Sequence, residues 1–111
     1  MNKYHNIKTT IDGITFDSKH EAERYCELKM LERGKQIYDL KLQPRFEIQP
    51  SYKKNGKTVR AVEYVADFSY YDKTGKLFVE DAKSEATRQD KVYRLKKKLI
   101  EYKYDFTIDE V

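Results

Sequence analysis

Two aspartates and a lysine interrupt a stretch of alternating apolar residues, namely Asp67, Asp81 and Lys83. Apolar segments on both sides of a polar turn at residues 72–75 predict a β-hairpin. A turn there pairs residues whose numbers sum to about 147 or 148, which sets Asp67 opposite Asp81 or next to it. Because side chains alternate along a strand, Lys83 shares the face of Asp81, whereas Glu80 points to the other face. We therefore expect two carboxylates and an ammonium to converge on a face that is otherwise apolar.

This group of charges suits the hydrolysis of a phosphodiester bond. Mg²⁺ or Mn²⁺ takes carboxylate and carbonyl oxygens as ligands and can activate a water molecule. Asp67 and Asp81 would supply two such ligands, and the backbone carbonyl of Ala82 a third. Lys83 would orient or deprotonate the water, or stabilise the transition state of the phosphate. The alternative is a structural ion cluster in which the lysine simply pairs with both aspartates, and the spacing leaves both interpretations open.

A helix is predicted from Asp17-Ser18 to Arg33, where Gly34 ends it. Ser18 and Glu21 have the spacing of a capping box, in which the glutamate reaches back to the cap. Glu21 also shares a helical stripe with Tyr25 and Leu28, the face expected to meet the sheet. From that face it could add a metal ligand or act on water. Both roles of Glu21 remain open at this point.

The other predicted elements follow one another along the chain. Residues 1–17 are expected to form a loose arm and a small β-ribbon turning at Asp12-Gly13. The expected later elements are extended segments at Ile37–Leu40 and Leu42–Pro50, a turn at Lys54–Lys57, strands at Val59–Tyr71 and Lys76–Lys83, a helix at Thr87–Tyr102 and a last strand at Tyr104–Ile108. Val92, Leu95 and Leu99 form an apolar stripe that would pack this second helix on the sheet.

Composition limits the class of protein. The 111 residues fit one small domain, and 14% aromatic residues argue against a disordered chain although 38% are charged. The single Cys26 is expected to be a buried small hydrophobic residue, and His5 and His20 to be surface residues rather than metal ligands. No segment resembles a signal peptide or membrane span, so we expect a soluble intracellular protein without a small-molecule cofactor.

Positive charge is concentrated in the second helix. The formal net charge is +4, yet residues 88–103 alone carry seven Lys or Arg against two acids. Such a segment is typical of sequence-independent contact with DNA phosphates. The residues expected to make these contacts are Arg88, Lys91, Arg94, Lys97 and Lys98. An ordinary solvated helix face is the alternative.

The series of Ser18 to Tyr25, then Ala66-Asp67-Phe68, then Val79 to Lys83 resembles the PD-(D/E)xK nuclease superfamily. It is most similar to the small phage and prophage endonucleases grouped as domain of unknown function 1064, relatives of transposon-end endonucleases and Holliday junction resolvases. The resemblance covers Tyr4 to Ile108. It implies an α/β fold of the α+β kind, with a restriction-endonuclease-like core: a central mixed four-stranded sheet flanked by two helices.

The resemblance also implies roles for single residues. Glu21 matches the helix acid, Asp67 the first aspartate, and Asp81 and Lys83 the acid and lysine of the D-x-K motif. Ala66 stands where the superfamily name has proline, and Ser84 replaces a glycine often found after the lysine.

The function expected from this resemblance is a Mg²⁺-dependent endodeoxyribonuclease specific for branched DNA, such as Holliday junctions. It would act as a homodimer, be encoded by a phage or prophage, and work in the bacterial cytoplasm. The alternatives are a DNA-binding module without catalysis, and a nuclease active only within a partner complex.

Overall fold

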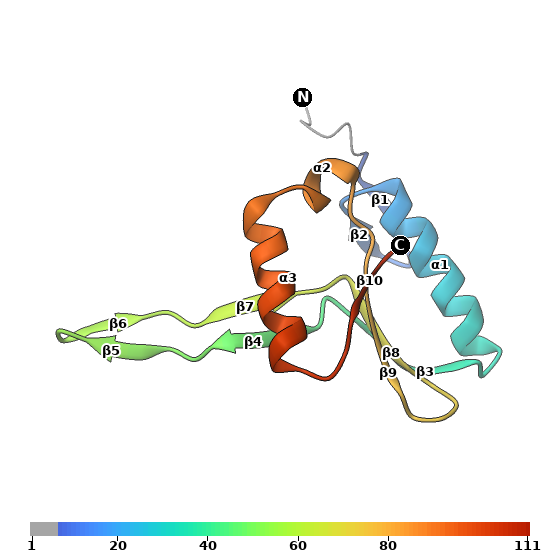
Figure 1. The fold of residues 1–111 in the computed structure, drawn as a ribbon. Helices are drawn as coiled ribbons and strands as arrows, with labels where there is room; N and C mark the ends of the chain where they lie inside the picture. The colour runs from blue at the N-terminus through green and yellow to red at the C-terminus, as the bar shows by residue number, and fades with distance from the viewer. Residues whose placement is uncertain (1–6) are drawn as a thin grey trace.

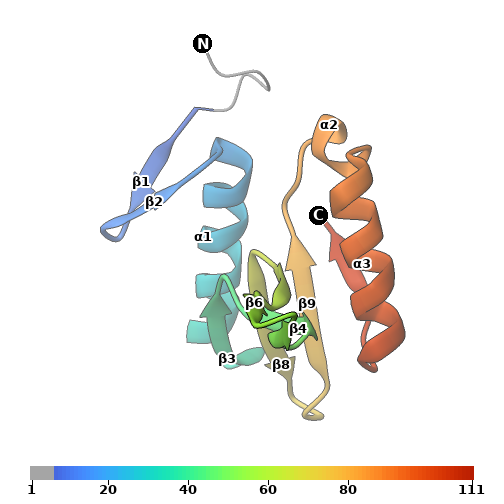
Figure 2. The same cartoon turned by 90° about the vertical axis from the view of Figure 1, so that its left-hand side faces the viewer.

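A mixed four-stranded sheet separates two helices in the computed structural model, which describes residues 7–111 (Figures 1 and 2). Its strands lie in the order β10 (Ile108–Glu110), β9 (Leu77–Asp81), β8 (Phe68–Asp72) and β3 (Ile37–Leu42). β9 and β10 are parallel and the other neighbours antiparallel. The predicted α/β class and mixed four-stranded sheet are therefore confirmed. His5 and the start of the expected N-terminal arm lie outside the described residues.

Each face of the sheet is covered by one long helix. Helix α1 (Lys19–Arg33) and helix α3 (Lys91–Lys103) lie on opposite sides, as Figure 2 shows. The core under α1 contains Phe16, Ala22, Tyr25, Leu28, Ile37, Phe68 and Tyr70, with Cys26 packed against it. The core under α3 contains Tyr64, Ala66, Val79, Ile100 and Ile108. Alternation along β8 and β9 separates the two sets, since successive side chains point to opposite faces. None of the described helices is long and apolar enough to cross a bilayer.

The start of the described chain follows the local sequence signals. Strands β1 (Thr9–Ile11) and β2 (Ile14–Phe16) form the predicted ribbon, and its Asp12-Gly13 turn has positive φ angles of 54° and 75°. Helix α1 begins after Ser18, whose hydroxyl oxygen accepts from the Glu21 N–H at 3.1 Å, and it ends at Gly34. The predicted bounds of α1 are confirmed because caps depend on residues close in sequence.

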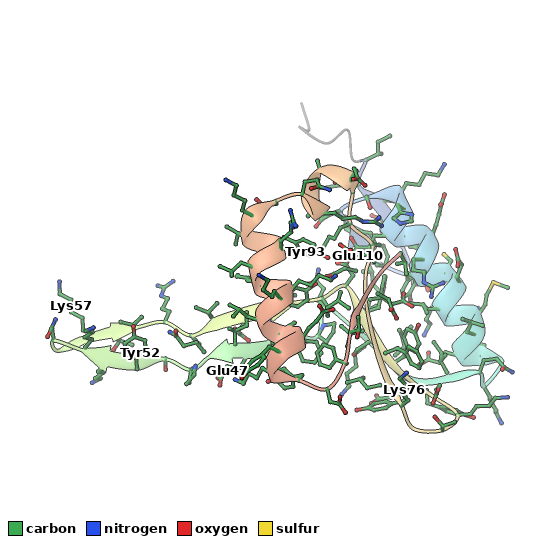
Figure 3. The ribbon with its side chains drawn as sticks, in the orientation of Figure 1. Glu47, Tyr52, Lys57, Lys76, Tyr93 and Glu110 are labelled. Atoms are coloured by element: carbon green, nitrogen blue, oxygen red, sulfur yellow. The ribbon has the colours of Figure 1, made fainter. Side chains whose placement is uncertain are left out.

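Between β3 and β8 the chain leaves the sheet and forms a long two-stranded arm (Figure 1). The arm consists of β4 (Arg45–Gln49) paired with β7 (Val62–Val65), and β5 (Tyr52–Lys54) paired with β6 (Lys57–Val59). Figure 3 shows Tyr52 and Lys57 toward the far end of the arm, beyond Glu47.

The prediction of one strand over Val59–Tyr71 is therefore wrong, because this stretch contains the end of β6, all of β7 and most of β8. The chain changes hydrogen-bond partner between two residues: the Ala66 N–H donates to the Pro44 carbonyl at 3.1 Å, within the arm, whereas the Asp67 N–H donates to the Glu80 carbonyl at 3.1 Å, within the sheet.

The last helix and strand also differ from the prediction. The expected helix over 87–102 is divided into α2 (Glu85–Arg88) and α3, because Ser84 caps the first and Asp90 caps the second. The last strand is β10, at residues 108–110 rather than 104–108. Tyr104 and Phe106 still pack inward, with their rings 5.7 and 4.9 Å from the ring of Phe46.

The apolar stripe that was expected to pack α3 on the sheet faces solvent instead, so that prediction is wrong. Val92, Leu95 and Leu99 are 60%, 56% and 40% exposed, whereas Ile100 is fully buried. Tyr93 and Ile100, seven residues apart, supply the buried face instead. The helical period was predicted, but tertiary packing selected a face with fewer apolar residues.

Candidate active site

Asp67 and Asp81 meet because the hairpin of β8 and β9 has the predicted register. Phe68 pairs with Glu80 and each later pair also sums to 148, so the next residue outward, Asp67, lies opposite Asp81. The backbone N–H of Asp67 donates to the Asp81 Oδ1 atom at 2.9 Å. Asp67 thus lies where the chain changes from the arm to the sheet, and Asp81 ends β9.

Lys83 completes the cluster from the same face. Its ammonium lies 3.1 Å from Asp67 Oδ1 and 3.7 Å from Asp81 Oδ1, and the Ala82 N–H donates to Asp67 Oδ2 at 2.8 Å. Burial lowers the pKa of Lys83, but the adjacent carboxylates outweigh it and the pKa is raised overall. The three side chains expected to converge are therefore together, and the lysine remains protonated.

Asp81 is completely buried, and its two oxygen atoms accept from different parts of the fold. Oδ1 accepts from the Asp67 N–H, and Oδ2 accepts from the hydroxyl of Tyr64 on β7. Burial raises the pKa of Asp81 to about 6, although the Lys83 charge acts in the opposite direction. This carboxylate thus carries negative charge that its surroundings only partly neutralise.

Glu21 approaches the cluster from the first turn of α1. It is 7% exposed, and Tyr25 and Leu28 on the same stripe are buried, as the helical pattern predicted. Burial, followed by the negative charge of Asp67, raises the pKa of Glu21 to about 7. Among residues 7–111 no group donates a hydrogen bond to its carboxylate, so only the Ser18 half of the capping box forms.

A cavity of about 280 Å³ opens beside these charges. Its lining includes Glu21, Ala82 and Lys83, together with Ser18 at the helix start and Thr87 of α2. The ionisable residues that line this cavity are therefore Asp17, His20, Glu21 and Lys83. Within the described part of the chain, no three carboxylate, imidazole or thiol side chains are close enough to hold a metal ion in this arrangement.

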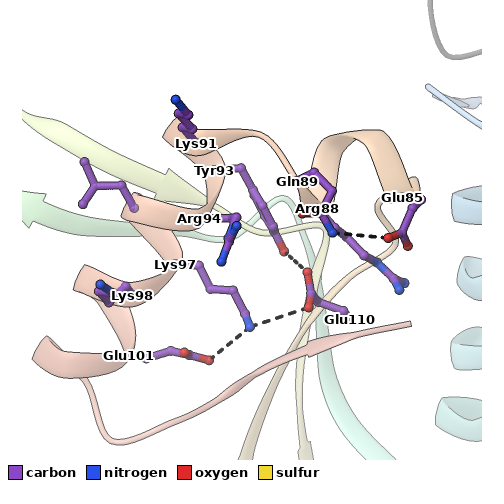
Figure 4. Close-up of a pocket in the computed structure, with 11 residues that line it drawn as sticks. Glu85, Arg88, Gln89, Lys91, Tyr93, Arg94, Lys97, Lys98, Glu101 and Glu110 are labelled. Atoms are coloured by element: carbon purple, nitrogen blue, oxygen red, sulfur yellow. Dashed lines mark hydrogen bonds and ion pairs between the residues drawn. The ribbon is translucent and has the colours of Figure 1, made fainter.

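The five residues expected to bind DNA line one groove along α2 and α3, with a volume of about 860 Å³ (Figure 4). Two of them have internal partners. Lys97 lies 4.0 Å from a Glu101 oxygen and 3.6 Å from a Glu110 oxygen, and Arg88 donates to the Val111 carbonyl at 3.1 Å.

The other three residues of that set, Lys91, Arg94 and Lys98, are exposed, and no ion pair to them forms within residues 7–111. The groove thus offers three free cations rather than five.

A family model described as "Protein of unknown function (DUF1064)" matches residues 1–108. The chain belongs to the DUF1064 family. No curated protein and no solved structure matches it. What this DUF1064 chain does must therefore be argued from the site itself.

The DUF1064 chain contains a second buried charge cluster that sequence reasoning did not predict. Glu80 does face away from Asp81, as predicted, and it is only 2% exposed. Arg24 of α1 donates to both of its oxygens, at 2.8 and 2.6 Å, and the Tyr70 hydroxyl donates to one of them. Since α1 covers this face, a cation on the helix was the signal that could have identified the partner of Glu80.

Aromatic contacts connect the site to the basic groove, and sequence reasoning missed them as well. The ring of Tyr64, which bonds Asp81, lies 6.3 Å from the ring of Tyr93 on α3. The Tyr93 hydroxyl in turn donates to Glu110 of β10 at 2.9 Å. The His20 imidazole donates to the Val111 carbonyl at 2.7 Å, and His20 also lines the cavity beside Glu21 and Lys83.

Proposed function

We propose that the DUF1064 chain is a metal-dependent DNA endonuclease of the PD-(D/E)xK kind. The observation that carries this proposal is the meeting of Asp67, Asp81 and Lys83 at the end of β9, with Glu21 beside them at a cavity. A small domain places charges inside an otherwise apolar region only at a cost in stability. Four charged groups from three elements are more than one structural ion pair requires.

The residues present fit a divalent cation. Three carboxylates face one ammonium, which leaves an excess of negative charge, and burial raises the pKa of both Asp81 and Glu21. Their oxygens are the ligands that Mg²⁺ and Mn²⁺ prefer, and each aspartate oxygen retains a second lone pair. Asp67 and Asp81 would hold the ion, with the Ala82 carbonyl as a further donor and Glu21 beside it. When bound, such an ion neutralises phosphate charge and makes water more acidic.

The protein's own groups then have separate tasks. Lys83, whose pKa is raised by its aspartate neighbours, keeps its proton at neutral pH and stabilises the negative charge of the phosphate rather than deprotonating water. Glu21, with a pKa of about 7 at the cavity, is suited to accept a proton from the attacking water.

DNA would lie across the groove beside the site. The exposed cations Lys91, Arg94 and Lys98 would contact phosphates, which gives affinity without sequence preference. A preference for branched DNA follows if two copies act about a two-fold axis, because a four-way junction presents two equivalent strands.

Cleavage assays test the proposal directly. Labelled four-way junction, linear duplex and single strand are incubated with the protein in Mg²⁺, in Mn²⁺ and in EDTA. Asp67→Asn should lower the cleavage rate by on the order of 10³-fold, since it removes a carboxylate that would hold the ion. Asp39→Asn, on the exposed edge of β3, is the matched control and should cleave normally. No cleavage of any substrate, or equal cleavage by the Asp67 variant, would exclude this site as the catalytic one.

A second candidate is a DNA-binding module without catalysis. It is favoured by the closed hydrogen bonding of the cluster: the four aspartate oxygens all accept from protein donors, and Asp81 is fully buried. In that case wild-type protein binds duplex DNA but cleaves nothing, with or without metal.

A further inference from the structure

The arm (residues 45–65) ends in a tip, residues 52–60, that carries only positive charge. Lys53, Lys54, Lys57 and Arg60 lie in this segment, and residues 50–62 contain no acid. All four are exposed, and the described residues form no ion pair with them. The tip therefore holds four cations whose charge nothing in the described chain neutralises.

The tip has no packing partner in the part of the chain that the structure describes, although the root of the arm does. Every residue from 52 to 58 is exposed, and a two-stranded ribbon alone is only marginally stable in water. At the root, α3 packs on β4 and β7. Lys103 and Tyr104 also donate to the carbonyls of Ile48 and Glu47, both at 3.3 Å. The arm is thus anchored at one end and unsupported at the other, as expected of an element that contacts another molecule.

Cross-strand pairing distributes the cations over both faces of the ribbon. Lys54 pairs with Lys57, whereas Lys53 pairs with Thr58 and so points to the opposite face. The Asn55-Gly56 turn, with φ angles of 52° and 75°, keeps the end narrow. A flat acidic surface would need cations on one face only. A groove of duplex DNA has phosphates on both sides, and the major groove admits a two-stranded ribbon.

We propose that the arm is a finger that enters a groove of duplex DNA while the candidate active site holds the strand to be cut. This inference rests on the proposed function. The Tyr64 hydroxyl fixes the root of the finger to Asp81, so the distance from tip to site is set by the fold. Gly56 is eight residues beyond Tyr64, roughly 26 Å along the strand. At 3.4 Å per base pair, the tip contacts the duplex about eight base pairs from the cleaved bond.

The experiment measures DNA binding under conditions in which cleavage cannot occur. The triple variant Lys53→Gln, Lys54→Gln, Lys57→Gln is compared with the control Lys35→Gln, Lys41→Gln, Lys73→Gln, which removes the same charge from exposed sites on the body. Affinity for a labelled 30-base-pair duplex is measured in EDTA over a series of salt concentrations. If all three tip lysines contact phosphates, their loss weakens binding on the order of 100-fold at 0.15 M salt and lowers the salt slope by about three. The control should change binding less than about 3-fold.

Duplex length provides the second measurement. On a four-way junction, whose crossover fixes where the protein binds, shortening the duplex arms to about four base pairs should bring wild type and the tip variant to equal affinity. If the tip variant binds a 30-base-pair duplex as tightly as wild type does, the proposal that the arm enters a DNA groove is wrong. The proposal is also wrong if sedimentation shows that wild type is a dimer and the tip variant a monomer, because the tip would then be an interface between copies. Because binding is measured in EDTA, failure of the arm to contact DNA can be distinguished from failure of the protein to cleave DNA.

Discussion

Raising the pH in the absence of divalent ions is expected to weaken the fold at its candidate active site. The native pKa of Glu21 is about 7 against an ordinary 4.5, and that of Asp81 is about 6 against 3.8. Both groups therefore bind protons more tightly in the folded state than in the unfolded one. Their contribution to stability is complete below about pH 4 and is lost as the pH rises through 6 and 7.

The magnitude follows from the two pKa values. At about 1.4 kcal/mol per pH unit, each group alone would cost about 3 kcal/mol on ionising in the folded protein. The charge of Asp81 is part of what raises the pKa of Glu21, so the two costs overlap. We expect a combined loss of about 3–5 kcal/mol between about pH 4 and pH 8, or a fall in Tm on the order of 10 °C for a domain of this size.

Urea unfolding at a series of pH values isolates this effect when variants are compared. Glu21→Gln cannot ionise, so at about pH 8 it should gain up to about 3 kcal/mol over wild type relative to its difference at pH 4. Glu23→Gln, an exposed position two residues along α1, should leave the pH profile unchanged.

Divalent ions should reverse the trend. At high pH each tenfold excess of Mg²⁺ over its Kd adds about 1.4 kcal/mol to wild type, and much less at pH 5, where protons compete. A Glu21→Gln variant whose stability relative to wild type does not depend on pH would refute the reasoning that burial, followed by the charge of Asp67, raises the pKa of Glu21.

Two further predictions concern the parts of the fold that hold the site. Arg24→Ala leaves the Glu80 carboxylate buried without its ion-pair partner, and should destabilise the protein by about 3–5 kcal/mol in urea unfolding, more than enough to show at any salt concentration. On α3, Leu95→Ser should change the free energy of unfolding by less than about 0.5 kcal/mol, whereas Ile100→Ala should cost about 2–5 kcal/mol. Equal costs at the two α3 positions would contradict the burial described above.

Local signals explain what the sequence could predict. The caps of α1 at Ser18 and Gly34 and the register of the β8–β9 hairpin depend on residues close together in the chain. That register alone brought Asp67 to Asp81, so the centre of the candidate site was predictable. Strand alternation then assigned Lys83 to the same face.

Interactions distant in sequence explain what could not be predicted. The division of the expected 59–71 strand depends on Ala66 bonding to Pro44 while Asp67 bonds to Glu80, two choices that no local pattern contains. The buried face of α3 was missed because the better apolar stripe of that helix faces solvent. The Tyr64 hydroxyl on Asp81 was invisible because Tyr64 belongs to the arm, which the sequence did not separate from the sheet.

The adjacent acids Glu80 and Asp81 also determine the register in which β9 pairs with its neighbouring strands. They are buried on opposite faces, the first against Arg24 and the second against Tyr64 and Lys83. A slip of β9 by one residue would exchange their faces, because side chains alternate with a period of two. The longer acid would then meet the partners of the shorter one, and Lys83 would leave the cluster. The two neighbouring charges therefore destabilise a shifted register of β9. The strand that carries the proposed catalytic residues thus also determines the alignment of the sheet.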